Sequence, residues 1–153
     1  MEPLDDNTYM GLALDEARAA ASVGEVPVGA VLVSASGEVI ARAANAPIAN
    51  HDPSAHAEIR ALRIGGEAIK NYRLQDASLY VTLEPCAMCA GAISLARIGR
   101  LVIAAADQKG GAVWHGPKFF KQPTCHWAPE IIQGPFGDIA GGLLKDFFQA
   151  RRR

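Results

Sequence analysis

The sequence lacks long apolar runs, an apolar leader and a strong net charge, and each absence excludes a class of protein. No run approaches the roughly 20 apolar residues that a helix needs to cross a bilayer. The acidic start MEPLDDNTYM has no apolar stretch of the kind that a secretory signal requires. The formal net charge of −1 gives no overall basic surface for nucleic acid. We therefore expect a cytoplasmic protein with no membrane anchor.

Cysteine is also scarce, with only Cys86, Cys89 and Cys125 in 153 residues. Three cysteines do not make a disulfide scaffold. The close spacing of the first two indicates a different role. In a reducing compartment, a close pair such as Cys86 and Cys89 more often binds metal or is redox-active.

The small net charge hides an uneven distribution. Residues 1–50 hold two basic and seven acidic side chains, whereas residues 101–153 hold seven basic and four acidic ones and end in three arginines. This favours a local basic patch, although a basic tail is more often simply solvated. There is no internal repeat, low-complexity tract or linker, so we expect a single domain over residues 1–153.

Apolar periodicity and turn residues predict helices that alternate with strands. Such alternation is typical of an α/β sandwich around a mixed sheet. A first helix starts at a cap at Asn7 or Thr8, and residues 107–135 read mainly as loop. The remaining elements are a strand hairpin at 28–34 and 38–44, a helix at 55–65 ended by Gly65-Gly66, a strand at 78–83, a helix from Pro85 to about 96, a strand at 100–106 and a helix at 140–148.

The stretch HDPSAHAEIRAL places His56 and Glu58 two residues apart, a spacing that points side chains to opposite sides of a helix interior. Because Pro53-Ser54 immediately precedes them, they lie in a first turn, where side chains can converge in front of the helix. The segment TLEPCAMCAGAI repeats this arrangement with Cys86 and Cys89 at i and i+3. The positive end of a helix favours thiolate, the form of cysteine that binds metal.

One imidazole and two thiolates suit zinc and leave a fourth position for water. Zinc lowers the pKa of its water to about 7, so Glu58 would take that proton and deliver it to a substrate. The combination of HAE at 56–58 with PCxxC at 85–89 is the known H-x-E…P-C-x-x-C signature of zinc nucleobase deaminases.

Two other interpretations of these residues stay open at this point. Cys86 and Cys89 could form a thioredoxin-like dithiol, which would leave His56 and Glu58 unexplained. A structural zinc could be closed by a fourth ligand, for which the candidates are His51, Cys125 and His126. Each of these three, and His115, also reads as an ordinary loop residue.

Beyond this signature, the chain resembles the bacterial tRNA-specific adenosine deaminase family of the cytidine deaminase-like superfamily. The resemblance covers nearly the whole chain. It implies a three-layer α/β/α fold with a mixed five-stranded sheet, a homodimer with one Zn²⁺ per subunit, and conversion of adenosine to inosine at position 34 of an arginine tRNA anticodon. It is carried by EVPVGAVLV (25–33), NAPIANHDPSAHAEIRAL (45–62), NYRLQDASLYVTLEPCAMCAGAI (71–93), ARIGRL (96–101), ADQKGGA (106–112) and DFFQARRR (146–153).

The resemblance also implies roles for individual residues. His56, Cys86 and Cys89 match the zinc ligands and Glu58 the proton shuttle, and the backbone N–H groups of Ala57 and Cys86 match groups that polarise the base or the attacking water. The substrate contacts carried over are Asn45 for the target nucleotide, Asp107 and Lys109 for the sugar and phosphates of the anticodon loop, and Phe147 and Phe148 for closing the pocket. Further candidates are Trp114 and Phe119 for base stacking and Lys118, Lys121 and the terminal arginines for phosphates.

The block from Trp114 to Trp127, rich in aromatic residues and proline, departs from the best-known members of that family. The departure concerns the substrate rather than the zinc chemistry. A second hypothesis is therefore a deaminase of a free base or small nucleotide, such as guanine or cytosine. A third, from another class, is a non-catalytic zinc-containing RNA-binding domain, in which Glu58 would be dispensable.

Overall fold

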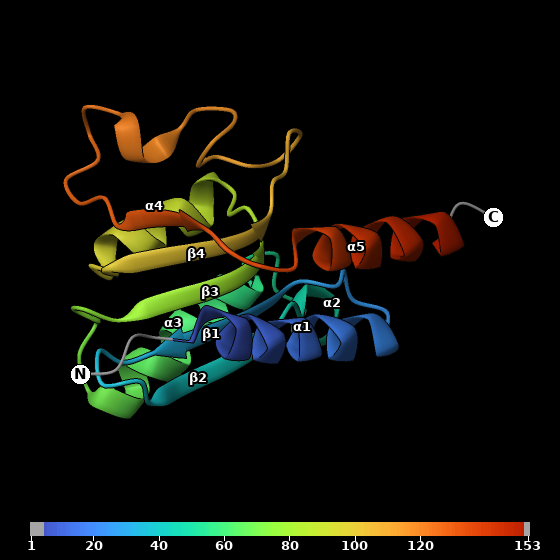
Figure 1. The fold of residues 1–153 in the computed structure, drawn as a ribbon, viewed down its shortest axis with the longest axis horizontal. Helices are drawn as coiled ribbons and strands as arrows, with labels where there is room; N and C mark the ends of the chain where they lie inside the picture. The colour runs from blue at the N-terminus through green and yellow to red at the C-terminus, as the bar shows by residue number, and fades with distance from the viewer. Residues whose placement is uncertain (1–4, 152–153) are drawn as a thin grey trace.

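A computed structural model describes residues 5–151 as one five-stranded sheet with helices on both faces (Figure 1). No helix among these residues has the length and apolar character needed to cross a membrane. The elements in chain order are α1 (Asp6–Ser22), β1 (Gly29–Val33), β2 (Val39–Ala44), α2 (Pro47–Asn50), α3 (Ala57–Ile69), β3 (Ser78–Leu83), α4 (Ala87–Leu95), β4 (Arg100–Ala105), the 3₁₀ turn η1 (Phe119–Lys121), β5 (Glu130–Gln133) and α5 (Gly137–Arg151).

The strand order is β2-β1-β3-β4-β5. β1 pairs antiparallel with both β2 and β3, whereas β3, β4 and β5 run parallel. The sheet is therefore mixed. Because β3 and β4 are parallel, their carboxyl ends meet at one edge, and the segments that follow them lie side by side there.

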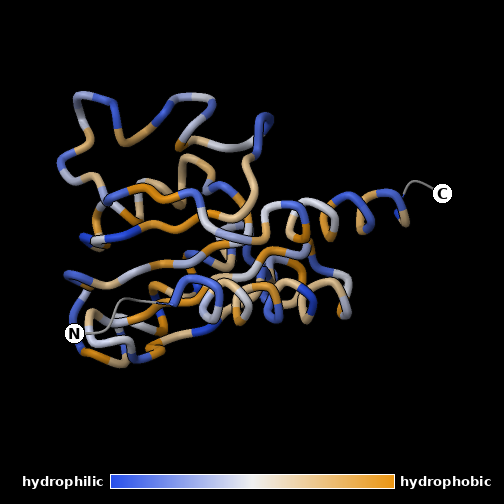
Figure 2. Tube along the Cα trace, viewed as in Figure 1, coloured by the Kyte–Doolittle hydropathy of each residue, from blue (hydrophilic) through white to orange (hydrophobic). Residues whose placement is uncertain are grey.

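Alternate residues of the central strands build two cores. Leu32, Leu79 and Leu101 pack with α3 and α4 on one face, whereas Val31 and Tyr80 pack with α1 on the other. Figure 2 shows the apolar character concentrated along these strands. The predicted three-layer α/β/α arrangement is confirmed, and so is the hairpin of β1 and β2.

The expected end of the second helix at Gly65-Gly66 is wrong, because α3 continues to Ile69. Gly65 is buried against β1, and a Cβ added there would overlap the Leu32 side chain. Glycine at this position permits close packing and does not stop the helix. The helix ends instead at Lys70, which takes a left-handed conformation with φ 60°.

Other boundaries also shift. The cap of α1 is Asp5, whose side chain accepts from the Thr8 N–H, so the helix starts before Asn7. β5, η1 and α2 were not predicted, and α5 is longer at both ends than 140–148. In Figure 1 the segment between β4 and β5 covers α4, where η1 contacts that helix.

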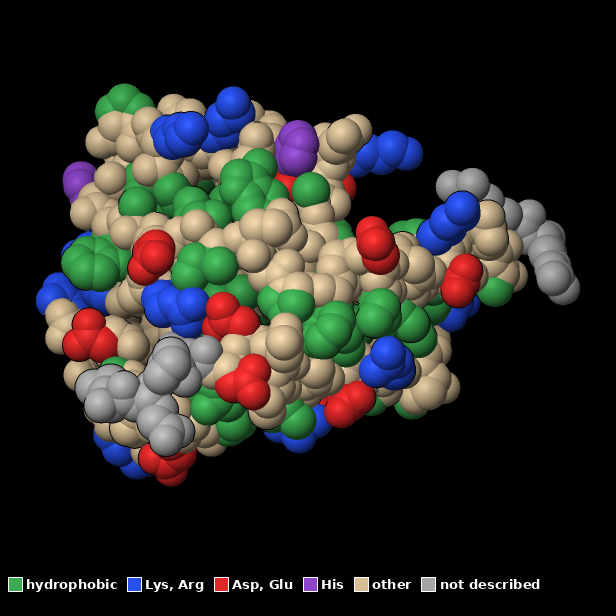
Figure 3. Space-filling model, in the orientation of Figure 1, with side chains coloured by type: hydrophobic (Ala, Val, Ile, Leu, Met, Phe, Trp, Pro, Cys, Tyr) green, Lys and Arg blue, Asp and Glu red, His purple; other side chains and the backbone are tan. Residues whose placement is uncertain are grey.

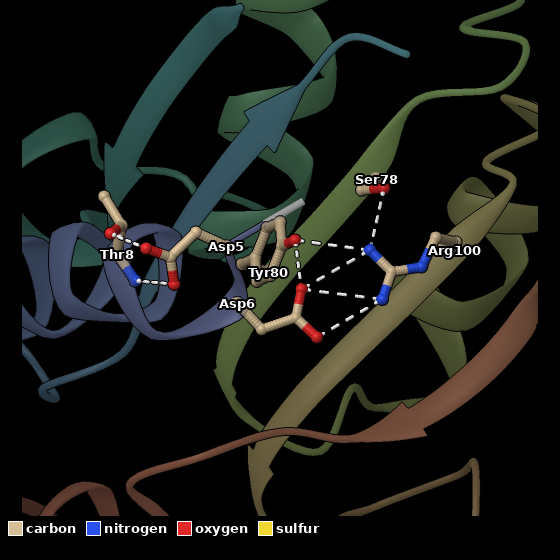
Figure 4. Close-up of polar contacts among 6 residues, drawn as sticks. All are labelled: Asp5, Asp6, Thr8, Ser78, Tyr80 and Arg100. Atoms are coloured by element: carbon tan, nitrogen blue, oxygen red, sulfur yellow. Dashed lines mark hydrogen bonds and ion pairs between the residues drawn. The ribbon is translucent and has the colours of Figure 1, made fainter. Parts of the chain in front are cut away.

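A polar network holds α1 to the sheet at the edge where β3 and β4 begin (Figure 4). The Tyr80 hydroxyl donates to Asp6 Oδ1 at 2.6 Å, and the Arg100 guanidinium lies 3.3 Å from Asp6 Oδ2. Burial and the hydrogen bond to Asp6 raise the pKa of Tyr80 well above its usual value. This network lies at the opposite end of these strands from the carboxyl edge, and it can be altered without touching residues there.

Candidate metal centre and active site

The N-termini of two helices lie close together, and a candidate metal ligand caps each of them. His56 is the N-cap of α3 and Cys86 the N-cap of α4, both with extended backbone. Pro85 is thus outside α4, and its expected place in the first turn is wrong. The Cys86 carbonyl closes the first turn by accepting from the Ala90 N–H, and the Pro85 carbonyl accepts instead from Ala112 N–H.

The three candidate ligand side chains converge. His56 Nδ1 lies 3.6 Å from Cys86 Sγ and 3.4 Å from Cys89 Sγ, and the three ligand atoms lie within 4.8 Å of one another. In a tetrahedral zinc site with ordinary Zn–N and Zn–S bonds, a nitrogen and a sulfur ligand are about 3.6 Å apart. The donor types and spacing therefore fit zinc.

A fourth protein ligand does not join this cluster among residues 5–151. Cys125 instead contacts Ser94 and the Trp127 carbonyl, and His51 ends α2 in a left-handed conformation. The cluster therefore has the three-ligand composition of a catalytic zinc site, with one position left for water. A closed structural site and a plain dithiol both fit this arrangement less well.

Glu58 lies in the first turn of α3, where the sequence places it, and it is 4% exposed. Burial, opposed by a backbone hydrogen bond, raises the pKa of its carboxyl group to about 7. The pKa values of the two neighbouring cysteine thiols shift in opposite directions. A hydrogen bond from Cys89 lowers the pKa of Cys86 to about 5, whereas the same contact and burial raise that of Cys89. Glu58 is thus a buried carboxyl group beside the two cysteines of the cluster.

Asn45 and Ala57, two residues expected to contact the substrate, contact each other. The Ala57 N–H donates to Asn45 Oδ1 at 2.8 Å, while the Asn45 N–H donates to the Val28 carbonyl. The Asn45 side chain therefore satisfies one N–H of the first turn of α3 and is fixed beside His56 and Glu58. In this state the Ala57 N–H is engaged by Asn45.

Asp107 and Lys109 follow β4 and lie in one tight turn. Asp107 Oδ1 accepts from the Lys109 and Gly110 N–H groups, each at 3.0 Å. Because this aspartate orders its own turn, the Lys109 side chain starts from a fixed backbone. The two residues sit after the carboxyl end of β4, next to the strand that leads into Cys86.

Phe147 and Phe148 lie near the end of α5 and pack edge to face, with ring centroids 5.5 Å apart. The Arg151 guanidinium lies over Phe147 and donates to the Gly24 carbonyl. Their closing of the pocket stays a prediction. Of the terminal arginines, Arg152 and Arg153 lie outside the described residues.

Sequence reasoning missed Glu84, the last residue before Pro85 and Cys86. Its side chain is fully buried and paired with His115 at 2.8 Å. Burial alone would raise the pKa of Glu84, but hydrogen bonds from the Asp107 N–H, His115 and other backbone groups together lower it. The only available signal was an acidic residue at the end of a strand that otherwise reads as buried.

Comparison with known proteins agrees with this geometry. Residues 3–105 match the family described as the cytidine and deoxycytidylate deaminase zinc-binding region. A tRNA-specific adenosine deaminase of Agrobacterium fabrum is 52% identical over 94% of each chain, and one of Haemophilus influenzae is 46% identical over 96% of this chain and 85% of its own. A solved structure from studies of A-to-I editing by tRNA:A34 deaminases is 52% identical, with a TM-score of 0.88 over 90% of this chain and 99% of that one.

Proposed function

Because this chain belongs to the tRNA-specific adenosine deaminases, within the cytidine and deoxycytidylate deaminase zinc-binding family, we propose that it converts adenosine to inosine at position 34 of a tRNA anticodon. The observation that carries this proposal is the three-ligand cluster with a buried carboxyl group, Glu58, next to it. The substrate class follows from the relatives that match this chain over nearly its whole length.

His56, Cys86 and Cys89 would hold Zn²⁺, which when bound lowers the pKa of a water molecule toward neutrality. Glu58 is not one of these ligands and is free to move protons. It takes a proton from the attacking water and gives one to N1 of adenine while oxygen adds at C6. It then takes the remaining proton from the oxygen now bonded to C6 and passes it to the departing amino group, so adenosine and water give inosine and ammonia.

The anticodon loop suits this site because its bases are single-stranded and can turn into a pocket without opening a duplex. Asn45, fixed at the start of α3, would contact the target nucleotide, and the turn of Asp107 and Lys109 would contact the RNA backbone. On the face drawn in Figure 3, basic and acidic side chains are interspersed, so we expect only local phosphate contacts on this face. Because the proposed substrate is a tRNA, we infer that the reaction takes place in the cytoplasm.

We expect zinc-loaded protein to form inosine on an arginine tRNA anticodon stem-loop that carries A34. The measurement is nucleoside analysis of the RNA after incubation. The matched control is the same stem-loop with G34, whose remaining adenosines should stay unchanged. Free adenosine, guanine and cytosine are assayed in parallel. Deamination of a free base with none of the stem-loop would support the second hypothesis and refute this one.

We further propose that the protein is a homodimer through a groove between α3 and α4. The groove is lined by apolar residues that include Tyr72 and Leu95, which are 70% and 72% exposed. Arg63 and Glu67, of opposite charge, also line it. A surface with both signs around an apolar centre can pair with itself, as a two-fold interface requires. A second copy is therefore the expected occupant.

If the protein dimerises, its average mass in sedimentation equilibrium should rise with protein concentration toward that of two chains. Leu95→Asp should shift the protein toward the monomer, because a buried unpaired carboxylate is costly at an interface. Ile139→Asp is the control, since Ile139 is exposed on α5, away from the groove. A wild-type protein that stays monomeric at micromolar concentration would contradict the dimer.

A further inference from the structure

Glu84 is surrounded by hydrogen-bond donors from a single loop. Its Oε1 accepts from the Asp107 N–H at 2.9 Å and pairs with His115 Nδ1 at 2.8 Å. Its Oε2 accepts from the N–H groups of Val113, Trp114 and His115 at 3.1, 2.9 and 3.1 Å. Both oxygens are thus occupied inside the protein, and no substrate atom can reach them.

Residues 107–115 pack tightly around the Glu84 carboxylate. A Cβ added at Gly111 would overlap the Glu84 carboxylate, so only glycine fits where the backbone passes. The Ala112 N–H donates to the Pro85 carbonyl at 2.9 Å, one residue before Cys86. Residues 107–115 are therefore bound to the short segment that leads directly into the metal-ligating helix start.

The loop begins with the turn that carries Lys109. Within the turn, Asp107 Oδ1 holds the N–H groups of Lys109 and Gly110. The Asp107 N–H is the link from the turn to Glu84. The Glu84 carboxylate is therefore the side-chain link between this turn and the segment that leads into Cys86, beside the backbone bond from Ala112 to Pro85.

We propose that Glu84 is a positioning residue for RNA, which fixes loop 107–115 so that the bound RNA backbone presents its target base to the zinc site. This rests on the proposed function. Glu84 acts through the loop and does not touch the reacting atoms. It should therefore govern how tightly RNA binds much more than how fast a fully bound base reacts.

Glu84→Gln tests the hydrogen bond that joins Glu84 to the Asp107 N–H at the start of the loop. The amide oxygen can replace Oε2 and accept from Val113, Trp114 and His115. The amide nitrogen then faces His115 Nδ1, which can accept, and the Asp107 N–H, which cannot. One buried donor is left unpaired, at the turn, so KM and Kd for the stem-loop should rise roughly tenfold. The single-turnover rate at saturating RNA should change less than about threefold, and zinc content should stay at wild-type level.

Asp6→Asn is the matched control, because it weakens a carboxylate network at the opposite edge of the sheet. It should lower Tm without changing KM. If both variants raise KM in proportion to their loss of Tm, or if Glu84→Gln loses zinc, the positioning role is overturned. His115→Ala removes one donor from Oε1 without altering β3 and should raise KM in the same direction, which keeps the test decisive should Glu84→Gln fail to fold.

Binding of the labelled stem-loop to zinc-loaded protein, followed by fluorescence anisotropy, separates this inference from the proposed function. A wild-type protein that binds the stem-loop and makes no inosine refutes the deaminase assignment, while the Kd comparison still decides the role of Glu84. A wild-type protein that does not bind the stem-loop refutes both. A tenfold weaker Kd for Glu84→Gln alone, with an unchanged Kd for Asp6→Asn, supports the positioning role.

Discussion

Glu58→Gln is expected to slow inosine formation on the order of 10²- to 10⁴-fold, the usual contribution of a positioned general acid–base group. Glutamine fills nearly the same volume in this buried position but cannot carry a proton between water, N1 and the amino group. Zinc content should not change, because the cluster of His56, Cys86 and Cys89 does not include Glu58. The measurement is the single-turnover rate together with the metal content of the same sample.

Glu25→Gln is a matched control for this variant. Glu25 is as buried as Glu58, and it accepts from the N–H groups of Ile48 and Ala49 in α2. Its replacement should affect stability and leave the rate at saturating RNA within a few-fold of wild type. A Glu58→Gln protein that deaminates normally would refute the role of Glu58 as the proton carrier. A wild-type protein that binds the stem-loop without forming inosine, with binding unchanged in Glu58→Gln, would favour the non-catalytic RNA-binding hypothesis. Loss of zinc in that variant would make Glu58 a ligand instead of a proton carrier.

The metal cluster could be predicted from sequence because its signals are local. Pro53-Ser54 and Pro85 mark helix starts, and the residue types at 56, 86 and 89 suit one metal. Nothing had to be known about the sheet except that both starts lie at the same edge. The one local error concerned Pro85, which precedes the N-cap Cys86 and does not enter the helix. The error leaves the i, i+3 relation between the two cysteines intact.

The features that were missed depend on contacts between distant residues. β5 is a short strand of four residues, none of them buried, and its pairing with β4 defines it more than its own composition does. Gly65-Gly66 looked like a helix stop because the closeness of Leu32 is invisible in sequence. Glu84 receives donors from residues 23 to 31 positions later, so its role follows from the tertiary structure alone.

Cys89→Ala is expected to remove zinc and to lower stability together. Cys89 is fully buried and is the third residue of α4, so its loss leaves only His56 and Cys86 on the cluster. Metal binding contributes about 10–16 kcal/mol in small structural zinc sites, and that energy stabilises the folded state to which the metal binds. Deleting one ligand should therefore bring metal content near zero, abolish turnover and lower Tm by much more than the removal of one sulfur atom would.

Cys125→Ala separates the metal effect from the effect of losing a cysteine. Cys125 is partly exposed and contacts Ser94 and Trp127 outside the cluster, so this variant should keep one zinc per chain and a nearly unchanged Tm. A chelator should lower the Tm of the wild type toward that of Cys89→Ala, and it should have little effect on Cys89→Ala itself, because that protein has no metal left to lose. Full zinc content in Cys89→Ala would show that the metal is held by another set of residues, and the three-ligand site would then be wrong.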